Sequence, residues 1–296
     1  MKPSFKQEAF SSFMMWFDHV LLDKAEAFVT RYDLKLVPYP SDNPDNRLPD
    51  GYKCYASAFK EWVIDEGIPN AMIAENSAFF DELGNQIPNS SFMIDYINGR
   101  IIFDSQVDYE WVRVASVSIK EVNIYTTNSS EEELITETMA SKHDLNYLHR
   151  DPYDNDNFIP IEPYDPIIPS SFLTMESGTN LPFELGGGLD QTVYEAKAIV
   201  FTKTDFELDC ILGYIEDSAR ESIPILDFAD IPFNEWGDRK YAYDYKQLKS
   251  SKKTSVMYIE DIVSSKTKDV VRKKVAPNFY VGFLDFKLVT ERCIRK

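Results

Sequence analysis

Three histidines are the residues best suited to acid–base or metal chemistry in this chain. His19 lies within an amphipathic segment, whereas His143 and His149 follow an acidic segment. No two histidines have the spacing of a zinc-binding helix, and no Cys-x-x-Cys pair accompanies them. A cation near the C-terminal end of a helix is stabilised by the helix dipole, which gives His143 and His149 a structural role. We therefore expect no metal site.

The cysteines and serines do not form a recognisable nucleophile motif. Cys54, Cys210 and Cys293 are too few and too widely spaced for a disulfide framework, so reduced thiols are expected. The chain has no Gly-x-Ser-x-Gly elbow. A Ser–His–Asp triad built from distant residues stays open at this stage, because its members need not be close in sequence. We predict no catalytic residue, no cofactor and no enzymatic activity.

Two further segments have the composition of ligand loops but not their pattern. Gly186-Gly187-Gly188 lacks the Lys-Ser/Thr of a phosphate-binding loop and is interpreted as a flexible turn. Asp151, Asp154 and Asp156 lack the glycine and the distal glutamate of a calcium-binding EF-hand loop. These aspartates are interpreted as solvated charges, with calcium binding as the alternative.

Charge is unevenly distributed along the 296 residues, which carry 31 basic and 49 acidic side chains and a formal net charge of −18. Residues 246–296 hold 13 Lys and Arg against 5 Asp and Glu, so this end is net basic. Phosphate contacts need basic residues in excess, which argues against a nucleic-acid-binding protein. The basic end is interpreted either as a solvated face or as a surface that steers one copy onto the acidic body of another.

The N-terminal sequence predicts a long amphipathic helix from Ser4 to Thr30. Ser4 and Gln7 form a capping-box pattern. The apolar surface is wider than one stripe, so the helix must be covered on more than one side. No apolar run reaches the ~18 residues of a membrane span, and no apolar core of a signal peptide follows Lys2 and Lys6. We expect a soluble protein without a membrane partner.

Strand patterns follow the predicted helix. Asn98-Gly99 lies between apolar, β-branched segments and predicts a hairpin with a two-residue type I′ turn. Residues 111–127 predict one long strand, with a bulge at Ala115-Ser116 where the alternation breaks. A β-sandwich or small barrel suits this stretch. Ser130 and Glu133 then predict a short helix over residues 128–144.

The second half predicts a smaller α+β unit. Residues 150–181 are rich in Pro and Asp and are interpreted as a linker or an arm that reaches a neighbouring subunit. Beyond it we expect strands at 192–202, 240–248, 255–264 and 279–293, with a helix capped by Thr204 and Glu207 that packs on one face of an antiparallel sheet. The expected fold class is thus α+β, with an N-terminal helix and β-rich domain (1–149), a linker (150–181) and an α+β domain (182–296).

Two segments resemble modules of virion proteins in tailed bacteriophages. Residues 92–125, with Asp95-Tyr-Ile-Asn-Gly-Arg-Ile-Ile-Phe-Asp104, are similar to β-modules of such proteins. Phe183-Glu-Leu-Gly-Gly-Gly188, the strand at 193–201 and the helix at 205–218 are similar to segments of neck and tail-completion proteins. This resemblance implies a structural component of the head-to-tail connection, located in the virion. It implies a homo-oligomeric ring that contacts portal, connector or tail proteins, with DNA passing through the lumen without specific binding.

Two other functions remain open at this stage. A baseplate or fibre-attachment protein would have the same sequence features. A carbohydrate- or receptor-binding module would use exposed aromatic side chains such as Trp62, Trp111 and Trp236 to line a sugar groove.

Overall fold

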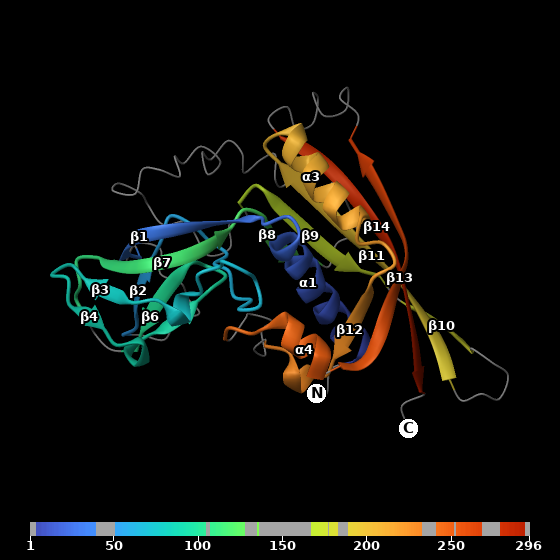
Figure 1. Cartoon of the computed structure of the whole chain (residues 1–296), viewed down its shortest axis with the longest axis horizontal. Helices are drawn as coiled ribbons and strands as arrows, with labels where there is room; N and C mark the ends of the chain where they lie inside the picture. The colour runs from blue at the N-terminus through green and yellow to red at the C-terminus, as the bar shows by residue number, and fades with distance from the viewer. Residues whose placement is uncertain are drawn as a thin grey trace.

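The computed structural model consists of two curled β-sheets, each of seven strands, with helices packed on the second sheet (Figure 1). It describes residues 4–39, 51–104, 107–127, 135, 167–176, 178–182, 189–232, 241–251, 253–267 and 279–293. The mixture of helices and mostly antiparallel strands confirms the predicted α+β class. The helix predicted over residues 128–144 lies outside the described residues except for Ile135.

The first sheet has the strand order β4-β3-β7-β1-β2-β6-β5. The bounds are β1 Phe28–Pro38, β2 Lys53–Ala56, β3 Phe79–Asp81, β4 Gln86–Ile87, β5 Met93–Asp95, β6 Arg100–Phe103 and β7 Val112–Lys120, with 3-10 turns η1 Ala74–Asn76 and η2 Asn89–Ser91. Because η2 joins the two edge strands, β4 and β5, the sheet curls almost into a barrel. Its interior contains packed aromatic residues. The ring centroids of Phe79 and Phe92 are 4.7 Å apart, and those of Phe92 and Phe103 are 5.5 Å apart.

The second sheet has the order β12-β13-β14-β11-β9-β8, with β10 paired to β11 beside β9. The bounds are β8 Asn123–Thr126, β9 Ser170–Met175, β10 Thr179–Pro182, β11 Leu189–Thr202, β12 Ser222–Leu226, β13 Lys253–Lys266 and β14 Tyr280–Cys293. The helices are α1 Phe5–Asp23, α3 Asp205–Glu216 and α4 Tyr245–Ser251, and a 3-10 turn η4 covers Phe228–Asp230. All strand pairs are antiparallel except β8 with β9.

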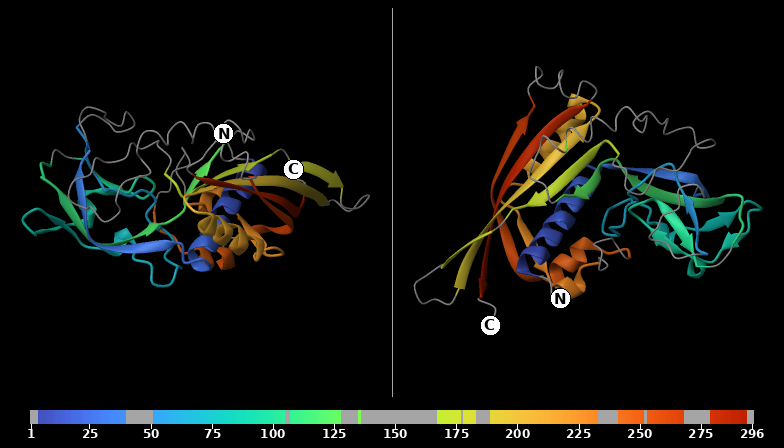
Figure 2. Two further views of the ribbon diagram at one scale, coloured as in Figure 1. Left: turned by 90° about the horizontal axis from the view of Figure 1, so that it is seen from above. Right: turned by 180° about the vertical axis from the view of Figure 1, so that it is seen from behind.

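Helices α1 and α3 lie on the same side of the second sheet (Figure 2). Phe13, Trp16 and Phe17 of α1 surround Phe286 of β14, with ring centroids 5.0, 6.3 and 6.4 Å from it. The apolar surface of α1 is therefore covered by the second sheet, although the sequence places this helix before the first one. Both capping boxes, at Ser4 and at Thr204, are present as predicted.

Several predicted boundaries are wrong for local physical reasons. Helix α1 ends at Asp23 rather than Thr30, because Phe28 begins strand β1 and pairs with Lys120. The second half of the predicted strand at 240–248 belongs to helix α4, because the Asp244 carboxylate accepts the amide of Gln247 at 3.0 Å and caps the first turn.

The predicted type I′ turn is also wrong, although its hairpin is present. Asp95 pairs with Arg100, so four residues, 96–99, form the loop. Gly99 has a φ of 60°, whereas Asn98 is not among the positive-φ residues. The Asp95 carboxylate instead accepts the Asn98 side-chain amide and the Arg100 guanidinium, both at 2.8 Å. These bonds stabilise the longer loop.

The long strand predicted over residues 111–127 is two strands in two different sheets. The chain leaves the first sheet after Lys120 and enters the second at Asn123. No bulge occurs at Ala115-Ser116, because the register between β1 and β7 is the same on both sides of it. The predicted division of the chain at residues 150–181 differs from the observed one in two ways. Elements α1 and β8 pack with the second sheet rather than the first. Residues 170–175 and 179–182 of the predicted linker form strands.

Candidate functional site

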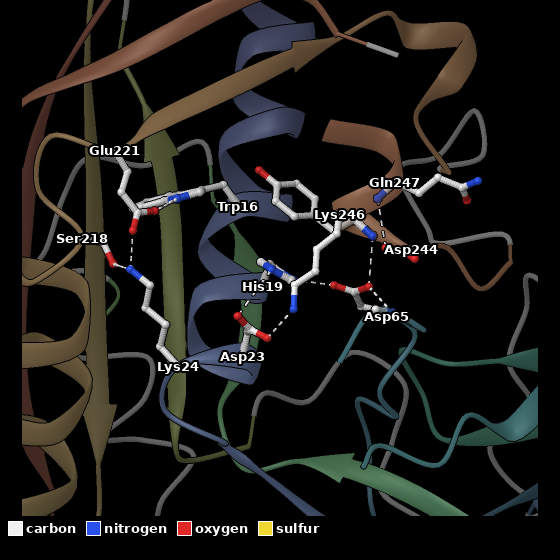
Figure 3. Close-up of polar contacts among 12 residues, drawn as sticks. Trp16, His19, Asp23, Lys24, Asp65, Ser218, Glu221, Asp244, Lys246 and Gln247 are labelled. Carbon is white, nitrogen blue, oxygen red and sulfur yellow. Dashed lines mark hydrogen bonds and ion pairs between the residues drawn. The ribbon is translucent and has the colours of Figure 1, made fainter. Parts of the chain in front are cut away.

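His19 of α1 forms the most enzyme-like contact among the described residues (Figure 3). Its Nδ1 lies 2.6 Å from Oδ2 of Asp65, and its Nε2 lies 4.0 Å from the Asp23 carboxylate. Asp65 is fully buried. Its other oxygen accepts the backbone N–H groups of Gly67 at 2.9 Å and Tyr245 at 3.0 Å. The carboxylate thus connects α1, the loop after β2 and α4.

In a Ser–His–Asp or Cys–His arrangement, a side-chain hydroxyl or thiol lies within hydrogen-bond distance of the imidazole. No serine, threonine or cysteine of the described residues hydrogen-bonds to His19. The Tyr245 ring packs 4.6 Å from the imidazole, but its hydroxyl is buried and has no hydrogen-bond partner in the described part of the chain. Burial, followed by the charges of Asp65 and Glu221, raises the pKa of Tyr245 well above its usual range. The phenol therefore stays protonated, and the pair holds elements together.

A second polar cluster joins the C-terminal end of α1 to the turn after α3 (Figure 3). Lys24 donates to the Ser218 hydroxyl at 2.8 Å and forms an ion pair with Glu221. The indole N–H of Trp16 donates to the same Glu221 carboxylate at 3.2 Å. Each partner is engaged by another protein group, so this cluster also has a structural role.

A buried ion triad connects α1 to the end of the first sheet. The Lys120 ammonium lies 2.8 and 2.7 Å from the two oxygens of Asp18, and 3.3 Å from Glu61. The three side chains are only 1–2% exposed. Burying charges in this way is costly unless each is paired, so the triad requires α1 and β7 to be held in a fixed arrangement.

The cysteines and tryptophans that the sequence singles out do not come together. Cys54 is buried and Cys210 is partly exposed, and both are free thiols. Trp62 is fully buried, and the Trp111 ring lies under the ammonium of Lys35 at 5.6 Å. His143, His149, Trp236, the aspartates at 151, 154 and 156, and the glycines at 186–188 lie outside the described residues.

Neither a metal cluster nor a spanning helix is found in the described residues. No three His, Cys, Asp or Glu side chains there are grouped so that they could hold a metal ion. No described helix is both long enough and apolar enough to cross a membrane.

The face of the second sheet opposite α1 and α3 is the surface that remains as a candidate site. Side chains of β11, β13 and β14 line a shallow depression of about 280 Å³ there. Its charged residues are Glu176, Glu195, Lys197, Asp261, Asp285 and Lys287. We refer to these six residues as the charged face. Lys197 lies 3.6 Å from Asp285. Lys287 bonds the Glu260 carboxylate at 2.8 Å, and this hydrogen bond raises the pKa of Lys287.

The charged face differs from a typical small-molecule pocket. A small-molecule site is usually a deep, largely apolar pocket with a few convergent polar groups, whereas this depression is shallow and lined mainly by charged side chains. Such a mixed-charge surface gives specificity and orientation to a protein partner.

An open strand edge borders the charged face. Strand β13 has 14 residues, but its neighbour β12 has only five and pairs with Lys253–Tyr258. Within the described ranges, no strand pairs with the outer side of residues 261–266. We call this segment the open edge. The sequence predicts both strands of the β13–β14 hairpin but not the open edge. The length of a strand alone does not show where along β13 the shorter strand β12 pairs.

No protein-family model and no curated protein matches this chain.

Proposed function

We propose that this chain is a non-catalytic structural subunit that works by packing against other protein subunits. The observation that carries the proposal is the open edge of β13 beside the charged face. An unpaired strand edge presents backbone donors and acceptors that another protein segment can pair with. A neighbouring mixed-charge surface would set the orientation of that partner.

The contacts of the ionisable residues support a structural role. His19, Lys24 and Lys120 are each engaged by carboxylates from a different part of the chain. None of these carboxylates is left to act on a substrate. The same contacts hold α1 between the two sheets, which suits a subunit that must transmit load without changing shape.

We further propose that the assembly is a ring in the neck that connects the head and tail of a tailed bacteriophage. This step rests on the resemblance of residues 92–125 and 183–218 to virion modules and on the acidic charge of the chain. A lumen lined by acidic residues repels phosphates, so DNA would pass through it without binding. A baseplate or fibre-attachment position would use the same surfaces.

The carbohydrate-binding alternative is less favoured by the described tryptophans. Sugar grooves use exposed aromatic faces, but Trp16 and Trp62 are 1% and 0% exposed. Trp111 is half-buried and its ring is in contact with Lys35.

Electron microscopy of the purified protein, alone and mixed with phage portal rings, tests the proposal. We expect rings of the protein alone or protein bound to the portal ring. Monodisperse monomers that ignore portal and tail proteins but bind glycans would refute it.

A further inference from the structure

The backbone geometry of the open edge is regular enough to specify how it would pair. A bulge shifts the register of β13 between Ile259 and Asp261, after which every residue pairs with β14 in one register up to Lys266. The amide of Thr267 donates to the Val281 carbonyl at 3.0 Å. In an antiparallel pair, N–H and C=O groups point alternately to the two sides. Ile262, Ser264 and Lys266 therefore point their backbone groups outward, away from β14.

The side chains of the open edge alternate between two environments. Ile262 packs toward the core beneath α3. Val263 lies on the opposite, uncovered face beside Asp261 and is 53% exposed. It is the one apolar side chain that the open edge presents on this face. An exposed β-branched residue in the middle of an open edge favours pairing with another strand.

We infer that, in the free protein, two copies pair through this edge as an antiparallel, two-fold symmetric dimer centred on Val263. This register sets Ile262 of one copy opposite Ser264 of the other, twice by symmetry. Both residues point outward, so each pair exchanges two backbone hydrogen bonds. Val263 of one copy faces Val263 of the other in a non-hydrogen-bonded pair, the type of pair in which side chains lie closest.

The proposed register also avoids like charges in direct opposition. Asp261 lies opposite Ser265, whose hydroxyl can donate to the carboxylate. The ladder ends with Lys266 beside Glu260 of the other copy. A register centred on Asp261 or on Lys266 would instead oppose two identical charges, which is destabilising.

The dimer carries a charge penalty that makes it dependent on salt. Around the open edge, carboxylates outnumber ammonium groups: Asp205 and Asp209 of α3 bind Lys266, and Glu260 binds Lys287 beside Asp261. The two-fold axis brings two such acidic regions together. Since salt screens repulsion between exposed charges, we expect dimerisation to strengthen as the salt concentration rises.

This pairing of two free copies goes beyond the proposed function, although both use the open edge. A two-fold contact uses the same patch on both copies and cannot close a ring, which needs a head-to-tail contact. The dimer would cover the open edge before assembly, and its two copies would have to separate before a subunit of the assembly pairs with the same edge.

Disulfide trapping tests the register directly. In a non-hydrogen-bonded antiparallel pair the Cα atoms are about 4.5 Å apart, which a disulfide can bridge. We expect Val263→Cys to form a symmetric intermolecular disulfide under mild oxidation. Asp261→Cys is the matched control, since the two copies of residue 261 would lie about 13 Å apart. The double variant Asp261→Cys/Ser265→Cys restores cross-linking. Equal cross-linking of Val263→Cys, Asp261→Cys and the wild type would overturn the register.

Sedimentation velocity tests the dimer itself without relying on a cysteine. Val263→Lys places two like charges opposite each other and should weaken dimerisation by about tenfold or more, whereas Val263→Thr should leave it nearly unchanged. Both variants change an exposed side chain, and circular dichroism checks that they are folded. A wild-type protein that stays monomeric at high concentration and high salt would overturn the inference. A dimer that Val263→Lys leaves intact would do the same.

Discussion

Replacing Lys120 with methionine is the perturbation whose effect follows most directly from the structure. Lys120 is the only cation of the buried triad, and its removal leaves the carboxylates of Asp18 and Glu61 without it. Breaking a buried ion pair by removing one partner costs about 3 to 5 kcal/mol, because the remaining charge stays buried. Methionine keeps the length of the side chain, so this cost reflects lost charge pairing rather than a cavity.

Urea unfolding measures the predicted loss. With a slope of about 3 kcal/mol per molar for a chain of this size, the midpoint should fall by about 1 to 1.7 M. Lys197→Met is the matched control, because Lys197 forms a partly exposed pair with Asp285 at 3.6 Å. Such pairs contribute about 0 to 1 kcal/mol. Adding Asp18→Asn to Lys120→Met should regain part of the stability, because it removes one of the two buried carboxylate charges that Lys120 balanced.

The stabilising role of the buried triad would be refuted if Lys120→Met were no more destabilised than Lys197→Met. It would also be refuted if Asp18→Asn added its full cost on top of Lys120→Met, because residues that share one ion network must be coupled.

Three further predictions concern single residues. Gly99→Ala should be strongly destabilised, because φ at this position is +60° and a Cβ there would overlap the Phe59 carbonyl. Gly213→Ala should instead raise the melting temperature, because Gly213 lies in an open position within α3. Burial raises the pKa of Glu121. The folded state therefore binds the Glu121 proton more tightly than the unfolded state does. Glu121→Gln should be more stable than the wild type at neutral pH. A series of melting temperatures should show this gain vanish as the pH falls through the folded-state pKa. Asp65→Asn should cost about 1.5 to 3 kcal/mol in urea unfolding, because a buried carboxylate loses its charged hydrogen bonds.

The sequence predicted the elements better than their partners. The capping boxes at Ser4 and Thr204 mark helix starts correctly, because a cap depends on residues only three apart. The strands near the C-terminus were also found, since their alternation is local. The position of α1 against Phe286 could not be predicted, because it depends on residues more than 250 positions away.

The candidate site was less predictable than the fold. Histidines and cysteines are the residue types best suited to acid–base or metal chemistry. His19 instead binds Asp65, 46 residues away in the sequence, and this contact holds elements together. The open edge has no sequence motif, because it arises where the short β12 stops beside the longer β13. The split of residues 111–127 between two sheets likewise depends on which strands pair with β7 and β8.

Hydrogen–deuterium exchange of the dilute monomer and of the assembled protein tests the central claim that this chain works through its protein contact surfaces. We predict that the outward amides of Ile262, Ser264 and Lys266 exchange more slowly once copies or virion partners are bound, while amides already paired inside the sheet, such as that of Ala198, change little. An assembly in which the open edge and the charged face exchange as fast as in the dilute monomer would contradict the account.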